Sequence, residues 1–445
     1  MKVLKFGGTS VGSAASIKNV RNIIAAQSGS KIVVVSAMSG VTNKLLEITE
    51  DLRQGREEAV EQGIHSLWLK HAALVEELIP ASPFQEETLA QLEALFEQLK
   101  EVTRENYNPG LEPVIVTHGE LFLSYIFSRF IQQDGLPNTW LDAKDFMHIS
   151  SLENPDIEPV RLLLDLSLHR EVRSQVYITQ GFVCIDRNKN ISTLKRGGSD
   201  YSATIIAAAV GAQEVQIWTD IDGFHNNDPR YVENTHPISH LTFDEAAELA
   251  YFGAKILHPQ TVSPVKDRKI PIYLKDTFHP EADGTLISSE VKTRGLKAIS
   301  AKDGITAIKI KSNRMLMAHG FLRKIFDVFD KHKTAIDMIT TSEIAISLTI
   351  DDTRNLNYIL EDLENFGEIS VDENHSIICI VGEAVIDDRN TYRLFEILNN
   401  IPVRMISYGG SSHNISLLVD TRNKIEALQR LNTKLFEETQ VAQFA

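Results

Sequence analysis

The sequence predicts an α/β protein, with a mostly parallel sheet sandwiched by helices up to about residue 290 and two smaller α/β units after it. Strand and helix patterns alternate through the first part, separated by glycine turns. Residues 31–36 form a β-branched run typical of a parallel strand buried on both faces. From Ser300 onward a segment repeats at an offset of 69 residues, which relates Ile325 to Leu394 and Ser342 to Ser411.

Composition excludes several classes of protein. A net charge of −15 argues against non-specific binding to nucleic acid and against an anionic membrane surface. We find no apolar run of membrane-spanning length and no signal segment after Met1. The two cysteines, Cys184 and Cys379, predict buried free thiols in a cytoplasmic protein rather than a disulfide framework or a metal cluster.

The first dozen residues combine a short strand, the Gly7-Gly8 turn and a helix over residues 13–26 capped by Ser13 or Ser16. Unpaired N–H groups at such a turn favour the binding of an anion, and we expect Lys5 to lie beside the turn. A lone glycine turn is more often an ordinary connection between strand and helix. The interpretation as a phosphate site therefore depends on the rest of the chain.

Polar residues follow the next strands as well. Ser36 and Thr42 come after residues 31–36, at the strand end where open α/β sheets place ligands. Residues 45–108 have helical spacing and predict an insertion whose charges form a solvated face. We expect residues 113–117 to form a strand, which would place Glu120 at a second junction between strand and helix.

The most specific motif is residues 196–200, Arg-Gly-Gly-Ser-Asp, between a strand over residues 176–184 and an apolar helix. Arg196 can bind a carboxylate through two hydrogen bonds, and Asp200 can face a metal ion or a phosphate. A strand over residues 215–218 then leads to an acidic loop whose spacing does not fit a calcium site. We interpret His258, before Pro259, as a capping residue rather than a ligand.

Walker A, Rossmann and protein-kinase motifs are absent from the sequence. What remains is a set of phosphate and carboxylate binders near strand ends: Lys5, Gly7, Gly8, Ser36, Thr42, Glu120, Arg196, Ser199, Asp200, Thr219, Asp220 and Lys255. Some of these residues can donate hydrogen bonds to an anion, and an Arg/Glu pair can bind a zwitterion. This combination indicates phosphoryl transfer to an amino acid. A carboxylate acceptor is already ionised at neutral pH, so catalysis would consist of positioning and charge neutralisation.

These motifs together resemble aspartate kinase, of the amino-acid kinase superfamily. The resemblance is carried by residues 5–11, 36–43, 196–200, 219–220, 228–230 and 252–259, in family order. It implies an amino-acid kinase catalytic domain over 1–295 with a helical insertion at 45–110. The paired repeat resembles two ferredoxin-like ACT regulatory domains, the first over 300–375, completed by 425–445, and the second over 376–424.

The resemblance implies that ATP, with Mg²⁺, phosphorylates the side-chain carboxylate of L-aspartate in the first step of lysine, threonine and methionine biosynthesis. Lys5, Asp200 and Lys255 would be catalytic, and no residue is assigned as a direct metal ligand. Aspartate would be bound by Ser36, Thr42, Glu120, Arg196 and Ser199. ATP would be bound by Lys5, Gly7, Gly8, Thr219, Asp220, His225, Arg230 and Lys255.

The resemblance is to the lysine-inhibited type, in a homodimer formed through the ACT domains or in a tetramer. The implied effector site comprises Met315, Ala318, Gly320, Leu322, Ile336, Asp337, Thr341 and Ser342, with Asp337 available to pair with an effector ammonium. Threonine stays open as the effector. A fused homoserine dehydrogenase is not expected in this chain. Two alternatives remain: a kinase for glutamate, acetylglutamate or a nucleotide, and an amino-acid sensor with an inactive kinase half.

Overall fold

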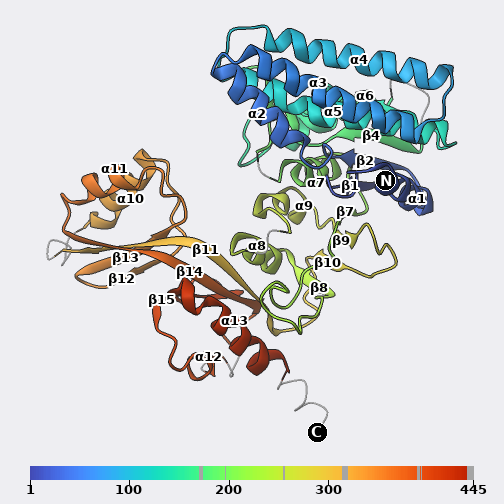
Figure 1. The fold of residues 1–445 in the computed structure, drawn as a ribbon. Helices are drawn as coiled ribbons and strands as arrows, with labels where there is room; N and C mark the ends of the chain where they lie inside the picture. Colours follow the sequence, from blue (N-terminus) through green and yellow to red (C-terminus); the bar gives the residue numbers. More distant parts are fainter. Residues whose placement is uncertain are drawn as a thin grey trace. The chain divides into compact units, whose positions relative to one another are not determined.

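The computed structural model describes residues 1–169, 174–195, 197–253, 256–312, 319–387, 391 and 393–437. They form two compact units, which we describe separately (Figure 1). The first unit contains Met1–Phe224, Ser239–Phe243 and Leu257–Glu290. The second contains His225–Ile238, Asp244–Ile256 and the described residues from Val291 onward.

The first unit is built on an eight-stranded sheet in the order β3-β4-β2-β1-β7-β9-β10-β8. The strands are β1 (Lys2–Phe6), β2 (Lys31–Val35), β3 (Thr139–Leu141), β4 (Val176–Gln180), β7 (Val215–Thr219), β8 (His240–Thr242), β9 (Ile272–Asp276) and β10 (Thr285–Ser288). Neighbouring strands are parallel except for β9 and β10, so the predicted mostly parallel sheet is confirmed. A short hairpin, β5 (Val183–Ile185) with β6 (Ile191–Thr193), lies outside this sheet.

Helices cover both faces of the sheet. Leu4 and Phe6 pack with α1 (Ala14–Ala26) in a large apolar cluster. Val3 points to the opposite face because side chains alternate along a strand, and α7 (Gly198–Val210) packs against β1, β2 and β7 without joining that cluster. Ser13 and Ser16 form a reciprocal capping box at the start of α1, as the sequence predicted.

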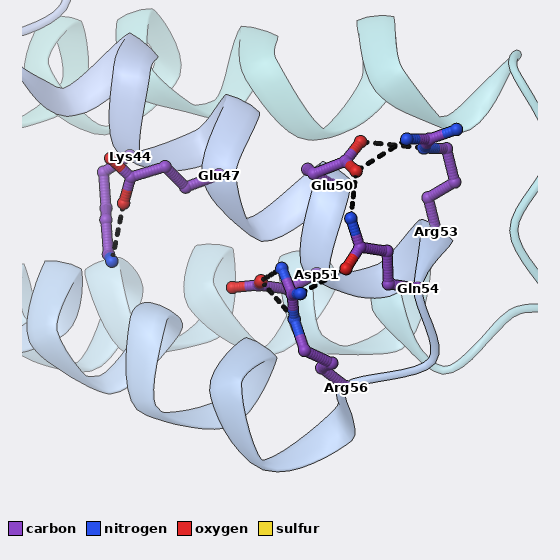
Figure 2. Close-up of polar contacts among 7 residues, drawn as sticks. All are labelled: Lys44, Glu47, Glu50, Asp51, Arg53, Gln54 and Arg56. Carbon is purple, nitrogen blue, oxygen red and sulfur yellow. Dashed lines mark hydrogen bonds and ion pairs between the residues drawn. The ribbon is translucent and has the colours of Figure 1, made fainter.

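The predicted insertion is helical: α2 (Val41–Arg53), α3 (Glu57–Leu78) and α4 (Pro83–Thr103). Its charges pair with near neighbours in sequence (Figure 2). Lys44 pairs with Glu47 at 2.9 Å and Arg53 with Glu50 at 2.6 Å, while Arg56 pairs with Asp51. Apart from Asp51, these side chains are exposed, as expected of a solvated face.

The predicted strand at residues 113–117 is wrong. These residues lie in α5 (Leu111–Gln133), so Glu120 lies inside a helix rather than at its start. The β-branched run looked like a strand, but α5 is apolar on nearly all sides and burial outweighs intrinsic propensity. By length and composition α5 could cross a membrane, yet 89% of its most apolar stretch is buried in the protein, which identifies it as a core helix.

The second unit has a six-stranded sheet in the order β12-β13-β11-β14-β16-β15. Its elements are β11 (Gly295–Lys311), α10 (Phe321–Lys331), β12 (Ile339–Thr341), β13 (Ala345–Ile350), α11 (Leu356–Leu363), β14 (Glu368–Glu383), α12 (Arg393–Ile397), β15 (Val403–Ser407), β16 (Asn414–Asp420) and α13 (Lys424–Asn432). The long strands β11 and β14 pair antiparallel along most of their lengths. They therefore join the two repeats in one sheet with two apolar cores.

The expectation that residues 425–445 complete the first repeat is not met by the described part of the tail. Ala427, Leu428 and Leu431 of α13 are buried in the core of the second repeat, with Ile378 and Ile415. The first half of β11 also joins this core, through Ile299. The sequence repeat does not indicate which half of the shared sheet a flanking segment joins. Residues 438–445 lie outside the described residues.

Two segments that we expected in the catalytic part fold with the second unit: residues 225–238 and α8 (Phe243–Tyr251) from Asp244 onward. Asn226 Nδ2 donates to Asn432 Oδ1 at 3.3 Å, and Asn227 Nδ2 donates to the Leu428 carbonyl at 3.1 Å. The remaining short elements are α6 (Ile157–Leu168), α9 (Ser263–Lys266), 3₁₀ turns at Ala143–Asp145, Pro259–Thr261 and Thr421–Asn423, and a π turn at Thr433–Glu437.

Candidate functional site

The candidate site lies at the carboxyl edge of the first sheet. β1 runs between β2 and β7 with Lys5 opposite Val34 and Ile217, so all three strands end together. A cavity of about 410 Å³ lies at this edge. It is lined by Lys5, Gly8, Ser36, Ala37, Met38, Ser39, Gly40, Thr42, Asn43, Glu120, Phe182, Lys195, Gly197, Gly198, Ser199 and Asp200.

The lining of this cavity contains an ion pair. Lys5 Nζ from β1 lies 2.7 Å from Asp200 Oδ1 in the first turn of α7, and the two side chains are only 10% and 13% exposed. The carboxylate fixes the position of the ammonium group while leaving its remaining hydrogens free to bind an anion. Lys5 can therefore present positive charge at a defined point.

Three glycines allow α7 to begin against the sheet. A Cβ atom added at Gly181 would lie 2.5 Å from Ser199 Cβ, and one at Gly198 would lie 2.5 Å from the Phe182 ring. Gly197 has a φ of +72°, in the left-handed region that glycine adopts without strain. The motif at residues 196–200 thus brings Ser199 and Asp200 to the cavity wall through close backbone packing.

Glu120 supplies a second, separate acidic group. It is buried in the middle of α5, and burial raises the pKa of its carboxyl to about 8, although a hydrogen bond from the Ala37 backbone and the charge of Lys5 both oppose this. Among the described residues, its Oε2 has no hydrogen-bond partner. A cationic group bound here would compensate the buried charge and lower this pKa again.

Seven of the predicted site residues line this one cavity: Lys5, Gly8, Ser36, Thr42, Glu120, Ser199 and Asp200. The expectation that Gly7 offers a free N–H is wrong, because that group donates to the Trp218 carbonyl at 3.2 Å and extends the pairing of β1 with β7. Arg196 and Lys255 lie outside the described residues.

The predicted nucleotide residues are divided between the two units. Thr219 and Asp220 end β7 in the first unit, where Thr219 Oγ1 donates to Asp220 Oδ1 at 3.1 Å. His225 and Arg230 belong to the second unit. His225 Nδ1 lies 2.8 Å from Thr235 Oγ1, and Arg230 pairs with Asp228 at 2.6 Å.

Sequence reasoning missed Met38 and Phe182 as cavity residues. Phe182 adopts a φ of 66°, which is unusual for an aromatic residue and turns the chain from β4 toward the cavity. The Gly181-Phe182 break in the strand pattern was the available signal. Met38 gave no signal, since a methionine in a strand-end loop is most often a packing residue.

The predicted effector residues lie around α10 and β12. Gly320 caps the start of α10 with a φ of +79°, and Leu322 lies in the first turn of that helix. Ile336 and Asp337 precede β12, Thr341 ends it and Ser342 follows it. Asp337 already has partners within the chain: Lys302 Nζ at 2.8 Å and Tyr251 Oη at 2.9 Å, both on Oδ1. Met315 and Ala318 lie outside the described residues.

We predict that Glu120→Gln stabilises the ligand-free fold more and more as pH rises. The pKa of Glu120 is about 8 when folded and near 4.5 when unfolded, so the wild-type chain loses stability between these values while the amide does not titrate. Melting temperatures across this pH range check the prediction, with the exposed Glu112→Gln in the same helix as control. A difference that does not change with pH would contradict it.

Comparisons with known proteins find two family models that match different parts of the chain. The sequence model of the amino acid kinase family matches residues 1–276, and that of an ACT domain matches residues 375–435. The lysine-sensitive aspartokinase 3 of Escherichia coli (strain K12) is 32% identical, over 98% of this chain and 99% of its own. The chloroplastic aspartokinase 1 of Arabidopsis thaliana is 33% identical, over 98% of this chain and 80% of its own.

Solved structures show the same similarity. Aspartokinase III of E. coli in complex with aspartate and ADP (R-state) matches with a TM-score of 0.86 and 30% identity, over 98% of this chain and 100% of that one. The same enzyme with lysine and aspartate (T-state) matches with a TM-score of 0.79, over 98% and 99%. Because these similarities extend over nearly the full length of both chains, this chain belongs to the aspartokinases of the amino acid kinase family.

Proposed function

We propose that this chain transfers the γ-phosphoryl group of ATP to the side-chain carboxylate of L-aspartate, giving 4-phospho-L-aspartate and ADP. One observation carries the proposal: the Lys5–Asp200 ion pair and the buried Glu120 share one cavity at the carboxyl edge of the sheet. A fixed ammonium can reduce the repulsion between two anionic substrates, ATP and a carboxylate acceptor. A buried carboxyl can bind the α-ammonium of an amino acid. The E. coli relative solved with aspartate and ADP supports this pair of substrates.

The reaction needs no general base. An oxygen of the substrate's side-chain carboxylate forms a bond to the γ-phosphorus, and the bond from that phosphorus to the bridging oxygen of ADP breaks. The electron pair leaves with ADP, and no proton has to be removed from the nucleophile. Lys5 reduces the repulsion between the two anions and stabilises the charge on the transferred group, while Asp200 holds Lys5 in place.

Substrate orientation follows from the two ends of the amino acid. Glu120 receives the α-ammonium, which restores its ionised form, and the hydroxyl-bearing residues Ser36, Thr42 and Ser199 lie around the same cavity. We assign the α-carboxylate to Arg196 from its place in the motif. This arrangement leaves the side-chain carboxylate as the group that faces Lys5.

Mg²⁺ would be held mostly by the phosphates of the nucleotide and by water. The described residues contain no group of three or more His, Cys, Asp or Glu side chains that could hold a metal ion. Asp200 offers a carboxylate at the cavity wall, and one or two carboxylates are enough for a magnesium ion that keeps its waters. When bound, the ion would neutralise charge on the phosphates.

We further propose that lysine inhibits the enzyme by binding near Asp337. The lysine complex of the E. coli relative supports lysine as the effector, and the place near Asp337 follows from the sequence motif. A homodimer formed through the second unit, or a tetramer, stays a prediction. So does a cytoplasmic location, for which the two free buried cysteines are the argument. His225, Arg230, Thr219 and Asp220 remain our proposed nucleotide contacts.

Trapping the acyl phosphate as a hydroxamate tests the reaction directly. With ATP and Mg²⁺, we expect product with L-aspartate and at most a trace with L-glutamate, because one additional methylene would displace the carboxylate from Lys5. Omission of ATP is the control. Product with glutamate but none with aspartate would favour the alternative amino-acid kinase, and no product with either would favour an inactive sensor.

We predict that Lys5→Met lowers kcat by about 10²- to 10³-fold, which is typical for loss of one charge-stabilising donor in a water-poor site. Steady-state kinetics and a melting curve check this together. Lys18→Met, at an exposed position of α1, is the matched control and should retain wild-type turnover. A folded Lys5→Met enzyme with normal kcat would exclude the proposed role of Lys5.

A further inference from the structure

The end of α8 is attached to the strand that carries Lys302. Tyr251, its last residue, donates from Oη to Asp337 Oδ1 at 2.9 Å, and Lys302 Nζ lies 4.5 Å from the centre of the Tyr251 ring. Two residues on, Gly253 has a φ of +120°, and a Cβ atom there would lie 1.9 Å from the Ala301 carbonyl oxygen. The Tyr251 side chain and the Gly253 backbone therefore both lie against β11.

The attachment extends along one face of α8. Glu245, Glu248 and Tyr251 are three residues apart and therefore lie on the same side of the helix. Glu245 Oε2 pairs with Lys297 at 2.8 Å, with both side chains buried, and Glu248 accepts a hydrogen bond from Asn414. Successive turns of α8 are thus bound by polar partners from β11, β16 and the segment before β12.

Asp337 has no accessible room for another ligand. Its side chain is only 1% exposed, and Oδ1 is occupied by Lys302 and Tyr251. Its Oδ2 is buried and accepts no hydrogen bond from any described residue. An incoming ammonium can reach this carboxylate only if one of the present partners moves away.

Lys302 is the partner that can move with least loss. Its Nζ also lies 2.8 Å from Asp351 Oδ2, and the Asp351 side chain is 41% exposed. Two carboxylates therefore share one ammonium. A second ammonium at Asp337 would leave one cation for each acid, with Lys302 kept by Asp351. Burial raises the pKa of Asp337 even with Lys302 in place, which agrees with a carboxylate short of positive charge.

We propose that Lys302 is an internal competitor of the effector: it holds Asp337 in the effector-free chain, and an effector ammonium displaces it toward Asp351. The displacement breaks the shared contact with Tyr251 and loosens the end of α8. Lys255, which we proposed as catalytic, follows four residues after Tyr251 in the sequence. Tyr251 is then the positioning residue through which the effector site acts on that segment. This inference rests on the proposed effector role of Asp337.

Lysine binding to the full chain, measured by calorimetry, tests the competition. Lys302→Met should tighten lysine binding about tenfold, within the usual range of coupling between sites, because the competitor is gone while Asp337 remains. Lys309→Met, at an exposed position of the same strand, is the control and should bind like wild type. Unchanged or weaker binding in a folded Lys302→Met chain overturns the inference and leaves the effector assignment intact. A wild-type chain that binds no lysine overturns both.

Tyr251→Phe tests the second step and keeps the inference testable if Lys302→Met fails to fold. The phenyl ring retains the packing but loses the hydrogen bond to Asp337. We expect lysine to bind within about twofold of the wild-type affinity, while the ratio of activity without lysine to activity at saturating lysine falls about fivefold, because the contact that lysine breaks is already absent. Wild-type inhibition in this variant, measured alongside wild-type binding, would overturn the role of Tyr251.

Discussion

The site depends on the parallel pairing of β1 between β2 and β7. That pairing buries the Lys5 side chain at the edge of the sheet, where an unpaired ammonium would be costly. The Asp200 carboxylate, 2.7 Å away, compensates the charge of this ammonium. The glycines around α7 are needed because the helix must begin within reach of this lysine. Glu120, on a helix buried on nearly all sides, adds a carboxyl group that burial keeps mostly protonated until a cation binds beside it. The cavity is thus built around groups that only bound substrates complete.

The proposed regulation uses the same principle. The second unit contains a buried carboxylate, Asp337, with one oxygen unpaired among the described residues, and an ammonium that two acids share. Helix α8 and residues 225–238 precede the repeats in the sequence but fold with them. Segments adjacent in sequence to the kinase motifs are therefore bound to the sheet that carries the proposed effector residues. A conformational change in that sheet can therefore affect these segments through direct contacts.

Much of this could be predicted from the sequence. Strands such as β2 are continuous β-branched runs, and the strand-end motifs gave six residues of one cavity because parallel strands end at a common edge. Glu120, the seventh, reaches the cavity from a helix. The prediction failed where burial or long-range pairing decides. Residues 113–117 have strand propensity but lie in a buried helix, the Gly7 N–H is used by β7, and α13 joins the second repeat rather than the first. The partners of Asp337 come from Tyr251 and Lys302, which no local pattern connects.

The most direct test of a site completed by its substrate is the proton balance of aspartate binding. Calorimetry at pH 7 in buffers of different ionisation enthalpy should show release of a large fraction of one proton per site, since a carboxyl with a pKa of about 8 is mostly protonated when free and ionised beside the bound ammonium. Glu120→Gln should remove this release. Binding of aspartate to the wild-type chain with no proton released would contradict the assignment of Glu120 and the charge arrangement built on it.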